Sequence, residues 1–424
     1  MAVSSARGMR DFLPRDKQRR EQLLGIIRET YARHGFEEIE TPAIEDLERL
    51  HSGLGGDNEK LSFAILKRGL SAEDLRHAAA PEDLADLGLR FDLTVPLARF
   101  YASNHAVLPP VFRAFHTGPV WRAERPQKGR YRQFVQCDID ILGEASHLAE
   151  VEVILATADA LHRLGVSGYT FRVNDRRLLT ALLSAAGIAP EFHGDALITL
   201  DKLDKIGSEG VLTELVERLP AGFDRGVLAA VLSGESIALD PAAISQVMGG
   251  SPEALAAAQE LCDWAMVVAE VLGPEIVVVD PTLVRGMGYY TSSIVEIAHP
   301  NMGISLGGGG RYDGMIGRFL GTDVPAFGLS LGFERLIDVV PMDSTGYPDR
   351  VALLYDTENP GEHLVKLKIQ LVDTGHTVRL VPKSKNLRPV YQQLVADGFS
   401  RVAEVTSDIS ESGSLAWREL SGGN

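Results

Sequence analysis

Arginines and carboxylates occur in this 424-residue sequence at positions that alternate with apolar residues, a pattern that places polar groups on one face of a sheet. Arg122, Arg285 and Arg335 each carry a planar guanidinium group that can hold two phosphate oxygens at once. Neighbouring carboxylates could hold a magnesium ion or a substrate ammonium group. Each residue alone is readily explained as structural, but together they favour an active site that handles phosphate. The candidate polar residues are Asp92, Thr94, Arg122, Glu124, Gln136, Asp138, Asp140, Arg285, Tyr289, Tyr290, Arg311, Tyr312 and Arg335.

A short basic segment begins at the first of these arginines. From Arg122 to Arg132 the only acidic residue is Glu124, and Pro126 and Gly129 indicate a loop rather than a helix. The simplest interpretation is a solvated charged loop. The alternative is a local patch that binds nucleic acid, although the formal net charge of −16 would repel nucleic acid at long range.

Two familiar motifs do not fit the chemistry they usually indicate. Gly328–Gly332 has the GxSxG spacing of a hydrolase nucleophile, but the preceding strands read as antiparallel rather than βαβ. The histidines that could serve Ser330, His363 and His376, lie beyond a domain boundary. The run Gly307–Gly310 matches neither a P-loop nor a dinucleotide-binding motif. We therefore set aside a serine hydrolase and both nucleotide folds.

Composition limits the class of protein further. Hydrophobic residues make up 45% and charged residues 24% of the chain, a composition typical of globular proteins. At roughly 150 residues per domain, the length indicates two or three domains. Cys137 and Cys262 lie far apart, which excludes a disulfide framework and indicates a reducing compartment. No HExxH motif occurs, so we expect no metal held by the protein alone. No apolar run approaches the roughly 20 residues of a membrane span, and no signal peptide is recognisable. We expect a cytoplasmic protein without membrane contact.

Apolar periodicity predicts helices and strands in the order of an α+β protein. Gln136, Asp138 and Asp140 should share one face of a strand, opposite an apolar face that meets the core. Residues 43–80 are predicted to form loops. The expected helices are 14–34, 148–164, a helical region over 178–268, and one beginning near 333. The expected strands are 36–41, 89–95, 118–123, 131–141, 276–279, 289–297, 304–306 and one before 333.

The polar stretch 341–348 is the best candidate for a domain boundary, because a βαβαβ pattern follows it. The strands of that pattern are expected at 351–355, 377–381 and 402–405. The predicted division is 1–172 for the first part of a catalytic domain, 173–270 for a helical insertion, 271–340 for the second catalytic part, and 349–424 for a small α/β domain.

Three segments, Phe36–Pro42, Val120–Phe134 and Gly328–Leu336, resemble motifs 1, 2 and 3 of class II aminoacyl-tRNA synthetases. Leu283–Tyr290 and Gly309–Asp313 are similar to the two motifs particular to the histidyl-tRNA synthetase family. The resemblance implies an antiparallel sheet of the class II type flanked by helices. It also implies a helical insertion and a C-terminal domain of the anticodon-binding kind.

The resemblance implies that the carboxylate of histidine attacks the α-phosphate of ATP, before transfer of the aminoacyl group to histidine tRNA. Arg122 would hold the α-phosphate and Arg335 the γ-phosphate, while Arg285 would stabilise charge that develops in the transition state. Asp140 and Tyr290 would bind the imidazole. The other ATP contacts would be Glu124, Tyr131 and Phe134. The other amino-acid contacts would be Asp92, Thr94, Gln136, Tyr289 and Tyr312, and the contacts to the tRNA acceptor end would be Arg125, Lys128 and Arg130.

The resemblance further implies use of Mg²⁺ with ATP and assembly as a homodimer. Two other functions stay open. One is a paralogue that activates an amino acid for an acceptor other than tRNA, as an amide ligase does. The other is a regulatory subunit of ATP phosphoribosyltransferase, against which the retention of all three arginines argues, because a regulatory protein has no use for a complete phosphate clamp.

Overall fold

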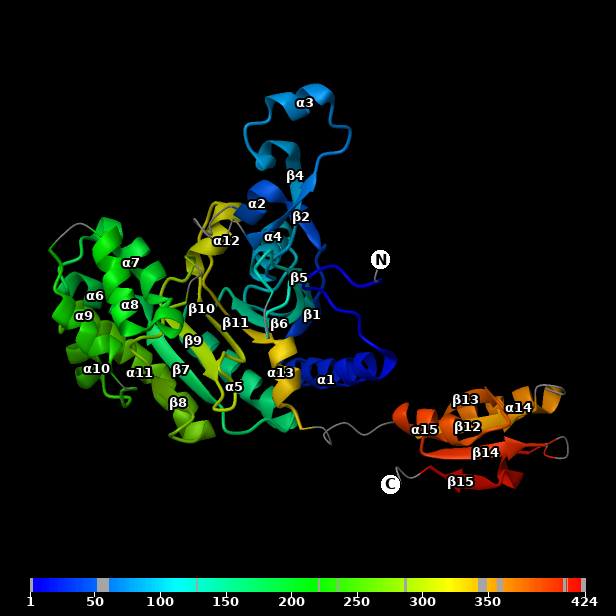
Figure 1. Cartoon of the computed structure of the whole chain (residues 1–424). Helices are drawn as coiled ribbons and strands as arrows, with labels where there is room; N and C mark the ends of the chain where they lie inside the picture. Colours follow the sequence, from blue (N-terminus) through cyan, green and yellow to red (C-terminus); the bar gives the residue numbers. More distant parts are fainter. Residues whose placement is uncertain are drawn as a thin grey trace. The chain divides into compact units, whose positions relative to one another are not determined.

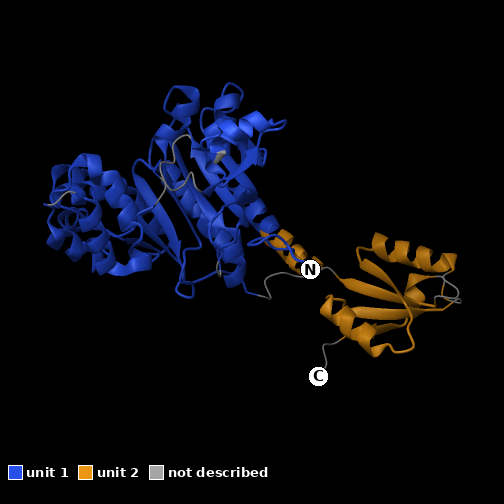
Figure 2. Ribbon diagram, turned by 45° about the horizontal axis from the view of Figure 1, so that its top comes forward, with its two compact units in different colours: residues 1–11, 24–341 blue, residues 12–23, 342–424 orange. Residues whose placement is uncertain are grey.

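The computed structural model describes residues 3–51, 61–126, 129–219, 222–234, 236–285, 288–341, 349–356, 361–406, 409 and 411–420. The chain forms two compact units (Figure 2). Unit 1 comprises residues 1–11 and 24–341, and unit 2 comprises residues 12–23 and 342–424. Helix α1, Pro14–Arg33, contributes residues to both units.

An eight-stranded sheet forms the centre of unit 1, in the order β1-β5-β6-β11-β10-β9-β7-β8 (Figure 1). The inner neighbours are antiparallel, and the outer pairs β1–β5 and β7–β8 are parallel. The α+β class and the hairpin of β5 and β6 are therefore confirmed. The strands are β1 Glu37–Ile39, β5 Phe112–Trp121, β6 Gln133–Leu142, β7 Thr170–Asp175, β8 Val277–Val279, β9 Ser293–Ala298, β10 Gly307–Arg311 and β11 Ala326–Gly332.

Helix α5, Leu148–Arg163, covers one face of this sheet and packs on β6 and β11. Its buried residues Val153, Ile154 and Leu161 are fully removed from solvent. The opposite face carries the candidate site. The remaining helices of the sheet region are α4 Thr94–Asn104, α12 Asp313–Leu320 and α13 Phe333–Val339.

A group of helices lies beside β7 and β8, as the Ala- and Leu-rich composition of this region predicts (Figure 1). These helices are α6 Arg176–Ala185, α7 His193–Leu200, α8 Leu203–Arg218, α9 Arg225–Leu232, α10 Pro241–Val247 and α11 Pro252–Leu272. Among the described helices of the chain, none is both long and apolar enough to span a bilayer.

The expectation of loops over 43–80 is wrong in part, because two strands of a small three-stranded sheet lie there. Its strands have three to five residues each, too short to give a clear alternation. The elements are β2 Ile44–Asp46, α2 Leu47–His51, β3 Phe63–Leu66, α3 Ala72–His77 and β4 Ala85–Leu89.

The strand expected over 89–95 is also wrong beyond Leu89, where β4 ends and the chain turns into α4. Pro96 is the third residue of this helix, where its missing amide hydrogen is not needed. The Asp92 carboxylate accepts a hydrogen bond from Val95 N at 3.2 Å and so supports the first turn. The apparent alternation of polar and apolar residues thus comes from a buried turn.

Two other strands begin later in the chain than expected. β9 begins at Ser293 rather than 289, and the strand expected at 304–306 is instead β10, the glycine run Gly307–Arg311. Glycine disfavours strands, so this run gave no strand signal.

Unit 2 has a four-stranded sheet in the order β13-β12-β14-β15. β12 pairs in parallel with β13 and β14, and β15 is antiparallel to β14. The βαβαβ prediction is confirmed, and β15 was not predicted. The elements are β12 Arg350–Tyr355, α14 Glu362–Asp373, β13 Thr377–Pro382, α15 Arg388–Ala396, β14 Arg401–Val405 and β15 Trp417–Glu419.

Candidate active site

Four neighbouring strands, β6, β11, β10 and β9, form the floor of the site. Their register places polar side chains in line with glycines across the sheet. The side chains of these rows project away from α5, because alternate residues of a strand face opposite sides. The two rows are Asp140–Gly328–Gly310 and Asp138–Ser330–Gly308–Glu296.

The glycines of this floor leave room for site residues. A Cβ atom at Gly328 would overlap Oδ1 of Asp140, and one at Gly308 would lie 2.8 Å from Cζ of Arg285. The glycine run therefore permits a carboxylate and a guanidinium group to lie directly on the sheet.

Asp140 contacts the first of three tyrosines that pack against one another. Tyr312 donates a hydrogen bond from its hydroxyl to Asp140 Oδ1 at 2.5 Å. The ring centroids of Tyr289 and Tyr290 are 4.8 Å apart, and those of Tyr289 and Tyr312 are 6.1 Å apart. Burial raises the pKa of Asp140 to about 7, although the hydrogen bond from Tyr312 opposes this shift. A buried carboxylate among aromatic rings suits a flat ligand ring that donates an N–H group.

Asp92 and Thr94 lie where α4 begins. Oδ2 of Asp92 is buried and has no hydrogen-bond partner in the described part of the chain. Burial raises the pKa of Asp92 to about 6, and the Val95 N–H and the charge of Arg122 oppose this shift. A buried acceptor without a partner is rare in proteins, so this oxygen is suited to a ligand that donates a hydrogen bond.

Gln136 offers a second acceptor of the same kind. Its Nε2 donates a hydrogen bond to Ser330 Oγ at 2.7 Å. Its Oε1 is buried and, among the described residues, has no hydrogen-bond partner. An ammonium group carries up to three donors and could satisfy both this oxygen and Asp92 Oδ2.

The three predicted arginines influence one another through their charges. Burial, and after it the charges of Arg130, Arg122 and Arg285, lower the pKa of Arg335 to about 10. Such mutual repulsion between guanidinium groups is relieved when a polyanion binds between them. This is the electrostatic arrangement expected of a polyphosphate site.

Each arginine is held by a specific contact. Two of them donate to backbone carbonyl groups and the third to a carboxylate. These contacts pre-organise the charges, so little reorganisation is needed when a ligand binds. The contacts are Arg122 Nε to Phe91 O at 2.9 Å, Arg335 Nη1 to Ser305 O at 2.8 Å, and Arg285 Nη1 to Glu296 Oε2 at 3.2 Å.

The residues expected to contact the nucleotide base lie at the β5–β6 connection. Arg122 Cζ lies 5.1 Å from the ring centroid of Phe134. Glu124 Oε2 lies 3.8 Å from Arg130 Nη1, and both side chains are partly exposed. Arg125 is described and exposed, whereas Lys128 lies outside the described residues.

Sequence reasoning missed the pair of Arg10 and Glu334. Arg10 Cζ lies 3.4 Å above the ring centroid of Tyr131, and its guanidinium group pairs with Glu334. Glu334 also accepts a hydrogen bond from Val135 N at 3.2 Å. Residues more than 300 positions apart meet here, and no spacing in the sequence could have indicated it.

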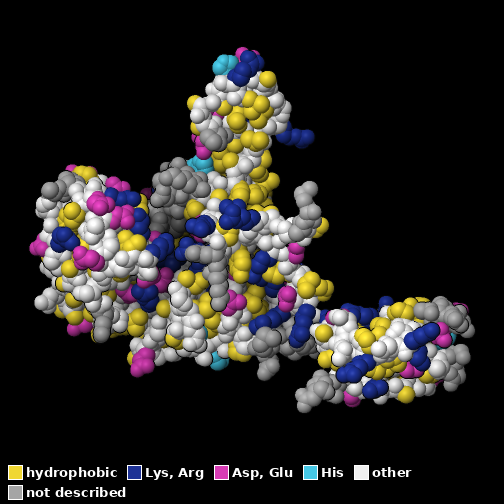
Figure 3. Space-filling model, in the orientation of Figure 1, with side chains coloured by type: hydrophobic (Ala, Val, Ile, Leu, Met, Phe, Trp, Pro, Cys, Tyr) yellow, Lys and Arg dark blue, Asp and Glu magenta, His cyan; other side chains and the backbone are white. Residues whose placement is uncertain are grey.

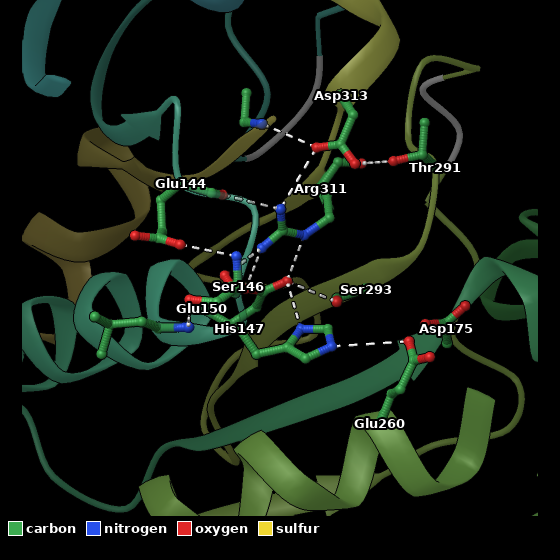
Figure 4. A network of polar contacts seen from close by, with 12 residues as sticks. Glu144, Ser146, His147, Glu150, Asp175, Glu260, Thr291, Ser293, Arg311 and Asp313 are labelled. Atoms are coloured by element: carbon green, nitrogen blue, oxygen red, sulfur yellow. Dashed lines mark hydrogen bonds and ion pairs between the residues drawn. The ribbon is translucent and has the colours of Figure 1, made fainter. Parts of the chain in front are cut away.

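Arg311 belongs to the other face of the sheet. Its Nε donates to Glu150 Oε1 of α5 at 2.7 Å, and Ser293 Oγ donates to the same oxygen at 2.9 Å (Figure 4). His147 lies 3.4 Å from Glu150 and 3.8 Å from Glu260 of α11. This network joins the sheet to α5 and α11, so Arg311 has a structural role.

Lys and Arg side chains gather over the middle of the face of unit 1 that Figure 3 shows. In the described part of the chain no group of three or more His, Cys, Asp or Glu side chains could hold a metal ion.

The fold is that of a class II aminoacyl-tRNA synthetase. The crystal structure of histidyl-tRNA synthetase from Nostoc sp. PCC 7120 superposes with a TM-score of 0.76 at 24% identity, covering 99% of this chain and 95% of the other. A Bacillus halodurans protein described as an ATP phosphoribosyltransferase regulatory subunit/histidyl-tRNA synthetase superposes with a TM-score of 0.75 at 20% identity, covering 95% of this chain and 97% of that one. At these identities the likeness concerns the fold alone.

Sequence comparison identifies the family. The family model described as histidyl-tRNA synthetase matches residues 8–336. A histidine–tRNA ligase of Leifsonia xyli subsp. xyli is 54% identical over 414 residues, which cover 96% of each chain. A histidine–tRNA ligase of Rhodopirellula baltica is 35% identical over 409 residues, covering 93% of this chain and 88% of the other. The chain belongs to the histidyl-tRNA synthetase family.

Proposed function

We propose that the protein activates histidine with ATP and transfers it to histidine tRNA. The 54% identity to a histidine–tRNA ligase over 96% of both chains carries this proposal. The regulatory and amide-ligase alternatives are not favoured, because the curated relatives that cover nearly the whole chain are histidine–tRNA ligases.

In the first step, a carboxylate oxygen of histidine attacks the α-phosphorus of ATP. The new O–P bond forms as the bond to the β-phosphate oxygen breaks, and histidyl-adenylate and pyrophosphate result. No general base is required, because the attacking carboxylate is ionised at neutral pH. Arg122 and Arg285 are proposed to stabilise charge at the α-phosphate, and Arg335 to hold the γ-phosphate.

The pocket on the sheet is proposed to bind histidine through both of its ends. Asp92, Thr94 and Gln136 would hold the α-ammonium and carboxylate groups, and the buried acceptors Asp92 Oδ2 and Gln136 Oε1 support this assignment. Asp140 and Tyr290 would bind the imidazole, with Tyr289 and Tyr312 enclosing it. A site that hydrogen-bonds the ring rejects isosteres lacking its nitrogens, because its buried polar groups would then remain unpaired.

The nucleotide is proposed to lie against Tyr131 and Phe134, with Glu124 at the adenine amino group. A magnesium ion bound with ATP would neutralise part of the phosphate charge and would depend mainly on phosphate oxygens.

In the second step, a hydroxyl of the 3′-terminal ribose attacks the carbonyl carbon of the adenylate, and AMP leaves. Arg125, Lys128 and Arg130 are proposed to contact the acceptor end, while the α/β domain 349–424 contacts the anticodon. We further propose that residues 1–172 and 271–340 form the catalytic domain and that residues 173–270 are an insertion in it. The protein is proposed to act as a homodimer in the cytoplasm.

ATP–pyrophosphate exchange measured with each of the twenty amino acids tests the first step, and charging of histidine tRNA tests the second. Exchange with histidine alone together with charged tRNA is expected. Exchange without charging would indicate another acceptor, and no exchange with any amino acid would contradict the proposal.

A further inference from the structure

Ser330 lies at the centre of the glycine-lined floor, and the reaction described above does not use it. It stands on β11 opposite Asp138 of β6, two positions from both Gly328 and Gly332. Its hydroxyl accepts a hydrogen bond from Gln136 Nε2 at 2.7 Å and donates one to Asp138 Oδ1. The three side chains therefore form a hydrogen-bonded chain from amide to hydroxyl to carboxyl, and Gln136 Nε2 also donates directly to Asp138 Oδ1 at 3.4 Å.

The two residues at the ends of this series of hydrogen bonds are buried. Gln136 is 7% exposed and Asp138 is 3% exposed. Burial, followed by the charge of Asp140, raises the pKa of Asp138 well above its ordinary value. This shift favours the neutral carboxyl over the carboxylate, and Oδ1 of Asp138 accepts the hydrogen bond of the serine hydroxyl.

The direction of these hydrogen bonds determines the orientation of the Gln136 side-chain amide. With Nε2 bound to Ser330, Oε1 is left as the free buried acceptor. In the opposite orientation the NH₂ group would face the ligand, and it would repel an ammonium group. A glutamine amide has no strong preference of its own between the two orientations, so its neighbours must select one.

We propose that Ser330 and Asp138 are positioning residues that fix the amide orientation of Gln136, so that its carbonyl oxygen accepts a hydrogen bond from the α-ammonium group of the amino-acid substrate. The inference rests on the proposed function for the identity of the substrate. It gives the GxSxG motif of β11 a use other than nucleophilic attack, since the serine proton is donated to a buried acid.

The test uses the full-length chain and three ligands in binding titrations. Histidine and histidinol both carry an ammonium group, whereas 3-(imidazol-4-yl)propionate has the imidazole and carboxylate but lacks the ammonium. Ser330→Ala and Asp138→Ala should each weaken histidine and histidinol binding about tenfold, the typical effect of losing one oriented buried hydrogen bond. Binding of the propionate and the KM for ATP should not change.

Two further variants separate positioning from general damage to the fold. Asp138→Asn retains an oxygen that accepts the serine proton, so it should restore histidine affinity to within about twofold of wild type. Ser293→Ala removes a buried hydroxyl from strand β9, on the opposite face of the same sheet, where it donates to Glu150 at 2.9 Å. This variant should leave all three affinities unchanged.

Equal weakening of all three ligands, or wild-type histidine affinity in Ser330→Ala, would overturn the inference. So would a loss in Asp138→Asn as large as that in Asp138→Ala. A wild-type chain without histidine-dependent exchange would instead contradict the proposed function, so the two failures can be told apart.

Discussion

Arg285 is held by Glu296, which also pairs with Arg172 at 2.9 Å. If Arg285 stabilises the charge that develops during adenylate formation, Arg285→Ala should lower the rate of that step about 100- to 1,000-fold with the fold intact. Single-turnover adenylate formation measures this rate. Arg113→Ala is the matched control, since Arg113 pairs with Glu152 of α5 on the other side of the sheet, and equal losses in both variants would refute the assigned role.

Burial of the Asp140 carboxyl lowers the stability of the folded protein when that group is ionised. Its folded pKa of about 7 exceeds the ordinary value of 3.8, so the folded state binds more protons, and wild-type stability falls as pH rises from about 4 to about 7. Asp140→Asn does not titrate. Between pH 5 and pH 8 its free energy of unfolding should therefore gain about 3 kcal/mol relative to wild type.

Chemical denaturation of the full chain at the two pH values measures this change, with histidine binding followed in parallel. The exposed Asp86→Asn is the control and should show no such gain. No gain in Asp140→Asn would show that Asp140 is ionised in the folded protein at pH 5, and an equal gain in Asp86→Asn would show that the change does not report on Asp140.

For single residues, the sequence predicts which face of the sheet a side chain lies on where polar and apolar residues alternate regularly along a strand. Gln136, Asp138 and Asp140 share the face that was expected, because β6 keeps its alternation through all three. The hydrogen bonds that join Gln136, Ser330 and Asp138 could not be predicted. They depend on the register between β6 and β11, which the sequence does not specify.

At the level of elements, the unusual strand is β10, whose glycines allow side chains from other elements to lie on the sheet. Its partner β11 contributes Gly328, where a Cβ atom would overlap Asp140. Gly328→Ala should therefore displace this carboxylate and raise the KM for histidine at least tenfold, since about one buried hydrogen bond to a charged group is lost.

The KM for ATP should change little in Gly328→Ala, because the severe clash is with the side chain of Asp140, which is proposed to bind histidine rather than ATP. Gly314→Ala in α12 is the control: a Cβ atom there meets nothing within 4 Å. It should be neutral or stabilise the protein by up to about 1 kcal/mol. A rise in both Michaelis constants for Gly328→Ala would point to a distorted sheet instead.

The elements that sequence reasoning misplaced share a physical cause, which is that local signals were weak or ambiguous there. Pro96 suggested the end of a strand but stands in the first turn of α4. The strands β2 and β3 have too few residues to show a period, and β10 consists largely of glycine. The long helices α1 and α5 were predictable, because each repeats its buried face over several turns.

At the level of the whole molecule, the two units have separate cores and separate proposed tasks. The proposed contacts to ATP and histidine lie within residues 24–341 of unit 1. Unit 2 buries apolar residues on both sides of its own sheet, as a domain with an independent core does. These residues include Val351, Leu353, Leu367 and Ala403 on one side and Ala352, Leu354, Leu394 and Phe399 on the other.

The formal net charge of −16 opposes binding of a polynucleotide, so contact with tRNA must rely on local cations. Lys385 and Arg388 are exposed where β13 leads into α15 in unit 2. If this unit binds the anticodon, replacing both by alanine should raise the KM for tRNA several-fold. It should also reduce the slope of log KM against log salt by about one for each lost phosphate contact.

ATP–pyrophosphate exchange should be unchanged in the Lys385→Ala/Arg388→Ala variant, because the adenylate is proposed to form entirely on unit 1. Lys366→Ala removes a positive charge from α14 of the same unit, where Lys366 pairs with Glu362 at 2.9 Å, and serves as the control. If the control raised the KM for tRNA as much as the double variant, the effect would reflect the total charge rather than this surface. Loss of exchange in the double variant would show that the two units do not work separately.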